Sequence, residues 1–244
     1  MPAFSNQIAL VTGASGGIGG AIAAALAEQG ATVCAVGRDK SKLGALRSRV
    51  SASESTSKIE PYAMDLTDEK TITDLTQAIA ARYGRLDILV HSAGAISHGK
   101  LEEATVSDFD LLYSANVRGP YLLTQKLLPL LKKPRGQVVF INSSVGLTAR
   151  ANTGQFSATQ HAFKALADAL REEVNADSVR VLNVHPGRTA TPRIQALHAK
   201  ENRPYNPELL LQPEDVASVV ANALALPWTA EVTSISIRPM QKSY

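Results

Sequence analysis

Short apolar runs alternate along the chain with longer stretches in which apolar residues recur at helical spacing. Several short runs are continuously apolar, which is typical of strands in a parallel sheet covered by helices on both faces. We therefore expect an α/β fold built on a doubly wound parallel sheet of about seven strands. The pattern predicts strands at 7–11, 32–36, 59–64, 86–91, 137–142 and 179–184, and helices at about 17–29, 40–50, 67–83, 107–131 and 153–175.

The chain shows no composition break and no linker rich in proline, glycine or serine, so we expect a single domain over 1–244. The segment 193–211 contains two prolines and little periodicity. We expect it to form a mobile lid beside a ligand crevice. The predicted helices at 107–131 and 153–175 carry substantial apolar surface, which a dimer interface would bury.

With 45% hydrophobic and 19% charged residues the chain suits a packed core, and its net charge of +3 is small. The tight basic cluster at Lys132, Lys133 and Arg135 is interpreted as a solvated helix end, so no nucleic-acid partner is expected.

Cys34 is the only cysteine and sits in an apolar run, where we expect a buried thiol. The five histidines lack metal-ligand spacing, so no metal site is predicted. The polar start and the absence of a membrane-length apolar run predict no membrane association and a cytoplasmic location.

The turn between the first predicted strand and the first predicted helix spans residues 12–19 and reads TGASGGIG. Glycine at such a turn permits a sharp bend, close approach of the backbone to a pyrophosphate and close helix–strand packing. The N–H groups at the start of the helix then face the phosphates. A glycine cluster alone is a weak signal, but at this place it predicts a dinucleotide site.

The T-G-x-x-x-G-x-G spacing of this turn resembles the short-chain dehydrogenase/reductase family, and further motifs follow in that family's order through nearly the whole chain. They are Asp65-Leu66, His91-Ser92-Ala93-Gly94 with His91 in place of the usual first asparagine, Asn116, Ser143, and Pro186-Gly187 with Thr191. The resemblance implies a Rossmann-like fold, a small-molecule substrate and a homodimer or homotetramer. It also implies that the cofactor is bound by Gly13, Ser15, Gly17, Ile18, Gly19, Arg38, Asp65, Leu66, Ala93, Gly94, Pro186, Gly187, Thr189 and Thr191.

Each motif also has an ordinary structural interpretation when it is taken singly. Asp65 suits a helix cap, Asn116 suits a helix kink, and His91 suits a hydrogen-bonded position in the core. Pro186-Gly187 occurs in many turns. The resemblance depends on the joint order of the motifs, not on any one residue.

The second predicted strand ends at Val36-Gly37-Arg38, without the carboxylate that commonly binds the ribose 2′-hydroxyl of NAD. The Arg38 guanidinium can stack on adenine and pair with a 2′-phosphate, and Lys40 adds positive potential. Asp39 is interpreted as the N-cap of the next helix. The sequence thus favours NADP(H) over NAD(H); the alternative is that Arg38 is a solvated surface residue.

In the resembled family, carbonyl reduction uses a tyrosine and a lysine spaced Y-x-x-x-K on one helix face. Counting from Ser143 with the family's spacing places Phe156 at the tyrosine position and Gln160 at the lysine position. Phenylalanine has no proton to donate, and glutamine has no charge to lower a pKa. The resemblance therefore implies an active site at Asn116, Ser143, Phe156 and Gln160 in which ordinary ketone reduction is weak or absent.

No neighbour in the sequence is a convincing replacement for the tyrosine–lysine pair. Lys164 lies one helical turn beyond Gln160, and His161 points about 100° around the helix from it. Ser144 and Ser157 lie nearby, but an unassisted hydroxyl is a poor acid.

Three functional interpretations remain. In the first, the protein is an NADP(H)-dependent oxidoreductase whose substrate needs no proton from the protein, such as an iminium carbon, which is already cationic. In the second, it is a non-catalytic nucleotide binder with a structural or sensing role. In the third, the two substitutions are engineered or belong to a recently decayed gene, and restoring tyrosine and lysine revives a reductase. The first is favoured because Asn116, Ser143 and the glycine turn are intact.

Overall fold

The computed structural model describes residues 2–53 and 58–241, and its centre is a seven-stranded sheet in the order β3-β2-β1-β4-β5-β6-β7. Every pair of neighbouring strands is parallel. The predicted α/β fold with a doubly wound parallel sheet is therefore confirmed. The strands are β1 (Ile8–Thr12), β2 (Thr32–Gly37), β3 (Lys58–Ala63), β4 (Ile88–His91), β5 (Gln137–Ile141), β6 (Arg180–Pro186) and β7 (Ser234–Ile237).

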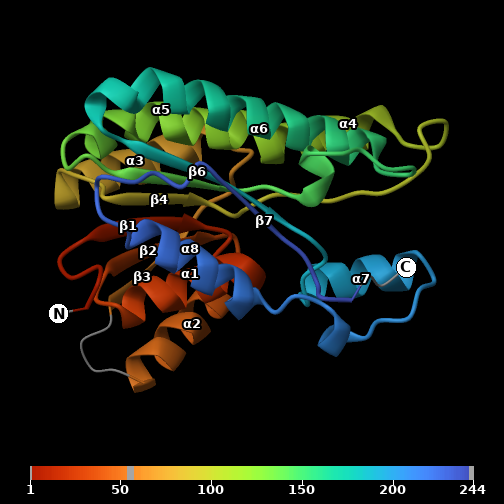
Figure 1. Cartoon of the computed structure of the whole chain (residues 1–244), viewed down its shortest axis with the longest axis horizontal. Coiled ribbons are helices and arrows are strands. Elements are labelled where there is room, and N and C mark those ends of the chain that lie inside the picture. The colour runs from red at the N-terminus through yellow and green to blue at the C-terminus, as the bar shows by residue number, and fades with distance from the viewer. Residues whose placement is uncertain (1, 54–57, 242–244) are drawn as a thin grey trace.

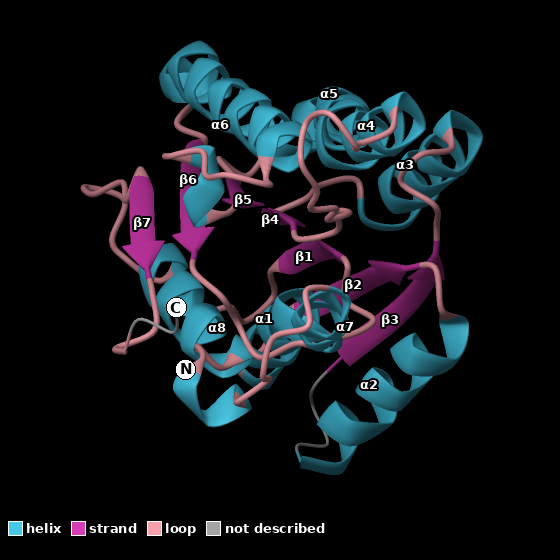
Figure 2. Ribbon diagram, turned by 90° about the vertical axis from the view of Figure 1, so that its right-hand side faces the viewer, coloured by secondary structure: helices cyan, strands magenta, loops and turns pink. Residues whose placement is uncertain are grey.

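Helices cover both faces of this sheet, and the two layers are visible in Figures 1 and 2. One layer consists of α1 (Gly17–Glu28), α2 (Lys40–Ser53) and α8 (Pro213–Leu224). The other consists of α3 (Glu69–Tyr83), α4 (Val106–Tyr113), α5 (Gly119–Lys132) and α6 (Gly154–Val174). Helix α7 (Pro192–Lys200) belongs to neither layer and lies beyond the carboxyl ends of the strands (Figure 1).

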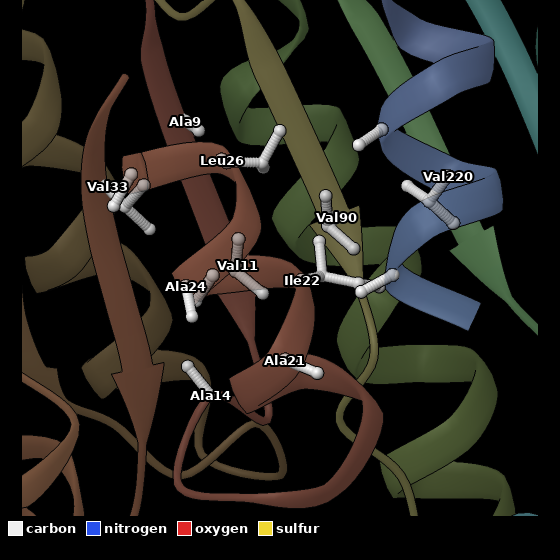
Figure 3. Close-up of a cluster of buried hydrophobic side chains, with 14 of the residues drawn as sticks. Ala9, Val11, Ala14, Ala21, Ile22, Ala24, Leu26, Val33, Val90 and Val220 are labelled. Atoms are coloured by element: carbon white, nitrogen blue, oxygen red, sulfur yellow. The ribbon is translucent and has the colours of Figure 1, made fainter. Parts of the chain in front are cut away.

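The core beneath α1 explains why that helix is so rich in alanine. Small side chains let its backbone approach the sheet closely, while Ile22 and Leu26 fill the space toward Val11, Val90 and Val220 (Figure 3). All five of these larger side chains are at most 1% exposed. The packing holds the start of α1 firmly against the end of β1, where the glycine turn lies.

The helical stretch predicted at 107–131 is interrupted in its middle. Helix α4 passes into a π-helical turn, η1 (Ser114–Arg118), and then into α5, so the stretch gains an extra residue within one turn. Asn116 stands at the centre of that turn. The alternative interpretation of Asn116 as a residue at a helix irregularity is thus correct as far as the backbone is concerned.

The C-terminal third differs most from the sequence prediction. No helix was predicted within the segment 193–211, but its first part belongs to α7. Thr191 accepts a hydrogen bond from the Ile194 amide at 3.2 Å and Pro192 stands at the first helical position, so a helix start signal was present. Helix α8 and strand β7 were not predicted. Strand β7 is a short segment in which serine and isoleucine alternate, so its apolar signal is weak.

Candidate active site

The predicted motifs meet at one edge of the sheet. The strand order runs 3-2-1 on one side of β1 and continues 4-5-6-7 on the other, so the chain reverses direction between β1 and β4. Ligands of open α/β sheets bind outside the carboxyl ends of the strands at such a reversal. The glycine turn follows β1, Ser92 to Gly94 follow β4, Ser143 follows β5, and Pro186-Gly187 closes β6.

At Gly13 and Gly19 the glycine turn is folded so tightly that a side chain cannot be accommodated. Gly13 has φ +71° and Gly17 φ +54°, a region that favours glycine. A Cβ on Gly13 would lie 2.8 Å from the Ala93 nitrogen, and one on Gly19 would lie 2.6 Å from the Gly13 oxygen. Thr12 joins the turn to the end of β4, because its Oγ1 accepts hydrogen bonds from the amides of Ser92 and Ala93, each at 3.1 Å.

The same turn fits a bound pyrophosphate. No side chain caps the start of α1, so its first N–H groups are free to face an anion. A Cβ placed on Gly16 would meet nothing within 4 Å, which leaves open space beside those groups. The Ser15 hydroxyl is buried and has no hydrogen-bond partner within 2–53 and 58–241, so it suits a ligand oxygen. Ile18 is half-buried and packs against the core from the first turn of α1.

Arg38 and Asp65 lie together at the rim near the ends of β2 and β3. Arg38 is exposed, and Asp39 accepts a hydrogen bond from the Lys42 amide at 3.1 Å, which confirms its predicted role as a helix cap. Asp65 accepts from the amide and the hydroxyl of Thr67 at 2.9 and 2.7 Å. These hydrogen bonds, aided by the Arg38 charge, lower the pKa of the Asp65 carboxyl. The rim therefore carries an anionic carboxylate beside a cationic guanidinium.

The segment after β6 docks against the glycine turn. The Gly187 amide donates to the Ile237 carbonyl at 2.7 Å, and the Thr189 hydroxyl donates to the Gly187 carbonyl at 3.1 Å. The methyl group of Thr191 lies 3.1 Å from where a Cβ on Gly17 would stand. Leu66 similarly packs against Gly119, whose own Cβ would lie 2.3 Å from the Leu66 oxygen. Thr191 therefore contacts the glycine turn, and Leu66 contacts the start of α5.

Asn116 ties the loop after β4 to the helices above it. Its Oδ1 accepts from the Ala95 amide at 2.7 Å, and its Nδ2 donates to the Ala95 carbonyl at 3.0 Å and to Thr159 Oγ1 at 3.1 Å. A side chain on Gly94 would collide with Asn116 Oδ1 at 2.8 Å. The side chain of Asn116 therefore fixes the path of the residues that follow Gly94.

Ser143 begins the short 3₁₀ turn η2 (Ser144–Gly146) at the end of β5. Its carbonyl accepts from His185 Nδ1 at 3.3 Å, while its hydroxyl accepts only a long contact of 3.4 Å from the Val145 amide. Such a contact is weak, so the hydroxyl retains its capacity to hydrogen-bond a substrate. Ser143 is half-buried, as expected of a residue at the wall of a crevice.

Phe156 and Gln160 lie one turn apart on α6 and are 8% and 6% exposed. Phe156 packs with Leu112 and Val145 in a small apolar cluster that Ala95 and Ile96 border. The main-chain oxygen of Gln160 accepts from Asn142 Nδ2 at 3.1 Å, and within the described ranges its side-chain amide makes no hydrogen bond. Phe156 therefore lies in apolar surroundings, and neither Phe156 nor Gln160 carries a charge.

The possible substitutes along α6 are engaged elsewhere. Lys164 pairs with Asp168 at 2.5 Å on the helix surface. Ser157 shares a hydrogen bond of 2.7 Å with Thr153, and His161 Nδ1 donates to the Ser157 carbonyl at 2.9 Å. The expectation that none of them replaces the relay agrees with these contacts.

His91 is a core residue, in line with the structural interpretation of that position. It is fully buried, its Nε2 lies 2.7 Å from Thr124 Oγ1, and its ring packs 5.1 Å from the Phe140 ring between centroids. Burial lowers the pKa of His91 to about 3, so the ring is neutral at physiological pH. It supplies no charge to the site.

A cluster of ionisable side chains lies beside Phe156 and was not expected from the sequence. His98 lies in the loop after β4, with its ring centroid 6.0 Å from that of Phe156. His98 Nδ1 is 2.7 Å from Glu201 Oε1 at the end of α7, and Arg188 lies 3.4 Å from the other oxygen of Glu201. No local spacing signals this cluster, because 103 positions of the chain separate His98 from Glu201.

Comparison with known proteins identifies the family. A sequence model of the short chain dehydrogenases matches residues 7–202, so the chain belongs to the short-chain dehydrogenase/reductase family. It is 30% identical over 241 residues to an uncharacterised oxidoreductase of Staphylococcus epidermidis, with 98% of this chain and 100% of that protein covered. It is 33% identical over 243 residues to a short-chain type dehydrogenase/reductase of Sinorhizobium fredii, with 98% and 93% covered.

Solved structures give the same result. A metagenomic short-chain oxidoreductase in complex with NADP has a TM-score of 0.84 and 29% identity, with 98% of this chain and 100% of that chain covered. A short chain dehydrogenase from Escherichia coli CFT073 complexed with NADPH has a TM-score of 0.87 and 31% identity, with 96% and 98% covered. Within the described part of this chain, no helix is both long and apolar enough to span a bilayer, and no histidine, cysteine and carboxylate groups gather as a metal site.

Proposed function

We propose that this protein is an NADP(H)-dependent oxidoreductase that works without the tyrosine–lysine relay and reduces carbon–nitrogen double bonds of imines and iminium ions. The observation that carries the proposal is the pairing of a fitted nucleotide turn with buried Phe156 and Gln160. A site that retains its nucleotide cradle but lacks the usual acid suits a substrate whose reduction does not depend on that acid.

The cofactor assignment rests on the chemistry of the rim and of the turn. Arg38 can pair with a 2′-phosphate, and Asp65 with Leu66 borders the adenine end of the crevice. The turn at 12–19 would hold the pyrophosphate, and Ala93, Gly94 and Thr189 would line the nicotinamide end. Related structures contain NADP or NADPH, which agrees with this choice. The bound dinucleotide supplies a hydride.

The substrate assignment follows from proton requirements. Reduction of a ketone makes an alkoxide, which must be protonated, and losing the general acid slows such a reaction about 10²- to 10⁴-fold. An iminium carbon is already cationic and becomes a neutral amine when it accepts a hydride. The apolar wall around Phe156 and the Ser143 hydroxyl would then shape the pocket, and Asn116 would position the loop after β4.

The direct test measures NADPH oxidation with a cyclic imine, 1-pyrroline, and with a ketone of the same ring size, cyclopentanone. The proposal predicts turnover of the imine and turnover of the ketone at least about 100-fold slower, from the missing acid. Turnover of cyclopentanone without turnover of 1-pyrroline would contradict the proposed function.

A second candidate, a nucleotide binder without catalysis, is favoured by one observation. The Asn116 side chain is wholly engaged in holding Ala95 and Thr159, which is a structural task. Tight NADPH binding with no turnover across a broad panel of carbonyls and imines would support this candidate. Robust turnover of any member of the panel excludes it.

We also propose that the protein assembles as a homodimer or homotetramer through the face of α4 and α5. Large apolar side chains are exposed there and in the loop that precedes α4: Leu101, Val106, Phe109, Leu111, Tyr113 and Tyr121. An apolar face of this kind on a folded protein favours burial against a second copy.

A further inference from the structure

His98 and Glu201 form a hydrogen-bonded pair that closes one side of the site. His98 Nδ1 lies 2.7 Å from Glu201 Oε1, and the two side chains are only 15% and 21% exposed. His98 comes from the loop after β4, and Glu201 is the C-cap residue of α7. The pair therefore joins the substrate side of the sheet to the segment that was expected to act as a lid.

The pair stands where the family's proton donor is missing. The His98 and Phe156 ring centroids are 6.0 Å apart, with the ring planes inclined at 46°. Two contacts hold the loop in this position: Asn116 clamps Ala95, and the Gly99 amide donates to the Asn152 carbonyl at 2.9 Å. The imidazole is thus fixed beside the ring that replaces the tyrosine.

The hydrogen bond to Glu201 determines which nitrogen of His98 is available. Because a carboxylate only accepts, Nδ1 carries a proton toward Glu201 and Nε2 is the nitrogen left for other partners. No group in the described part of the chain hydrogen-bonds Nε2. A carboxylate on one nitrogen of an imidazole orients the ring and fixes which nitrogen faces the site.

Glu201 is itself held as an anion. Burial alone would raise the pKa of the Glu201 carboxyl, but the hydrogen bond from His98 and the charges of Arg188 and Arg203 outweigh it and leave the pKa lowered. Arg188 is fixed in turn, because it donates to His198 Nε2 at 2.8 Å while His198 Nδ1 donates to the Pro204 carbonyl at 2.7 Å.

We propose that His98, oriented by Glu201, protonates the nitrogen of a bound neutral imine, so that this site, which lacks the tyrosine for carbonyl oxygens, reduces neutral imines as well as iminium ions. This inference rests on the proposed function. The His98 imidazolium transfers its Nε2 proton to the imine nitrogen, and the carbon receives the hydride that the bound NADPH supplies. The products are an amine, NADP⁺ and a neutral imidazole, which water reprotonates; Glu201 stays ionised throughout.

Two probes separate the donor from the rest of the site. 1-Pyrroline at a pH above its own pKa is neutral and needs a proton, whereas N-methyl-1-pyrrolinium is permanently cationic and needs none. His98→Gln is expected to slow reduction of neutral 1-pyrroline about 10²- to 10⁴-fold and to leave N-methyl-1-pyrrolinium reduction unchanged. As the pH falls, solvent protonates 1-pyrroline, and the difference in its reduction rate between the wild type and His98→Gln becomes smaller.

The other charged groups near the pair do not produce this pH pattern. Arg203 lies 3.6 Å from Glu201, Arg188 lies 3.4 Å from it, and Arg150 acts electrostatically on Arg188. All three guanidinium groups stay cationic over the range tested. His198 has both ring nitrogens engaged, and His161→Gln, which alters a surface histidine of α6, is the matched control and should behave as the wild type.

A second readout does not depend on turnover. Nitrogen-15 NMR of the imidazole rings is expected to show the His98 proton on Nδ1 in the wild type, and Glu201→Gln is expected to redistribute it between the two nitrogens. In the neutral ring, a proton found on Nε2 instead of Nδ1 in the wild type contradicts the pairing that the proposal requires, as does a tautomer that does not change in Glu201→Gln.

The outcomes distinguish the two proposals. If the wild type reduces both probes and His98→Gln slows both equally or neither, His98 is not the donor and the proposed function stands. If the wild type reduces neither probe, the proposed function fails, and the donor role of His98 fails with it, whatever the NMR result.

Discussion

Arg38 is the residue on which the choice of cofactor depends. It stands exposed at the end of β2, beside the Asp65 carboxylate, with no carboxylate at the strand end to accept from a ribose 2′-hydroxyl. Its side chain makes no hydrogen bond or ion pair within the ranges that the structure describes. A guanidinium in this position is free to take a 2′-phosphate as its partner.

Replacing Arg38 with alanine is therefore expected to weaken NADPH binding about 10- to 150-fold, since a hydrogen bond to a charged group contributes about 1.5–3 kcal/mol. NADH binding should hardly change. Titration of the fluorescence of each bound dinucleotide measures both constants. Arg47→Ala, which removes an exposed arginine from α2, is the control; equal loss of NADH and NADPH affinity in Arg38→Ala would contradict the assignment.

His91 links a single buried ring to the pH dependence of stability. The pKa of His91 is lowered to about 3 in the folded protein from about 6.5 in the unfolded chain. Between these two pH values the His91 ring is therefore protonated in the unfolded chain and neutral in the folded protein. The contribution of His91 to stability is complete above pH 6.5 and is lost as the pH falls toward 3. His185, whose pKa burial also lowers, acts in the same direction.

In His91→Asn, which places the family's usual residue at that position, the slope of the unfolding free energy against pH should fall by up to about 1.4 kcal/mol per pH unit between pH 6 and 4. Urea titrations at several pH values measure the slope. His185 is present in both proteins, so the difference between them isolates His91. An unchanged slope would show that the His91 ring is protonated in the folded state.

At the scale of single residues, the sequence predicted those site positions that follow strands at fixed spacings. Gly13, Asp39 and the pair Phe156–Gln160 could be placed because each lies a few residues from an element of clear pattern. His98 and Glu201 could not, because their contact depends on where α7 folds relative to the loop after β4. Only the tertiary structure brings these two together.

Among the elements, α7 has the most influence on the site. It begins with the Thr191 cap against Gly17 and ends with Glu201 beside His98, so it spans from the nucleotide turn to the substrate side. The apolar pattern gave no sign of this helix, because its residues are mostly exposed. The cap and the following proline were the signals that could have located it.

Thr191→Val removes the side-chain oxygen that accepts from the Ile194 amide and should destabilise α7 locally by about 1 kcal/mol. Amide hydrogen exchange across 193–200 should accelerate, while exchange in β1 and β4 should not. Thr191→Ser keeps the oxygen and serves as the control. If valine and serine give the same exchange rates, the cap does not hold the helix.

At the scale of the whole molecule, the apolar face of α4 and α5 is the feature that the monomer leaves unexplained. Leu101 is 83% exposed, Val106 75% and Leu111 55%. The sequence indicated that these helices carry more apolar surface than one chain buries, but the pattern alone does not say which side faces outward. In the folded protein the side chain of Leu112 is buried and that of Leu111 is exposed to solvent.

Leu111→Asp places a charge on this face and should convert the assembled protein to a monomer, or weaken its self-association at least about 10-fold, because an unpaired charge would have to be buried. Light scattering after size-exclusion chromatography measures the mass. Met240→Asp alters an exposed apolar residue away from α4 and α5 and should leave the mass unchanged. A wild-type protein that is already monomeric at micromolar concentration would contradict the proposed assembly.

We propose that Phe156 and Gln160 stand in place of the tyrosine–lysine pair, and the activity of a variant with the pair restored tests this. The measurement is kcat/KM with NADPH for 1-pyrroline and for cyclopentanone, in the wild type and in Phe156→Tyr with Gln160→Lys. We predict that the wild type prefers the imine and that the double variant gains ketone reduction about 10²-fold or more. A wild type that already reduces the ketone as fast as the double variant would contradict the account, as would a double variant that stays inert on the ketone.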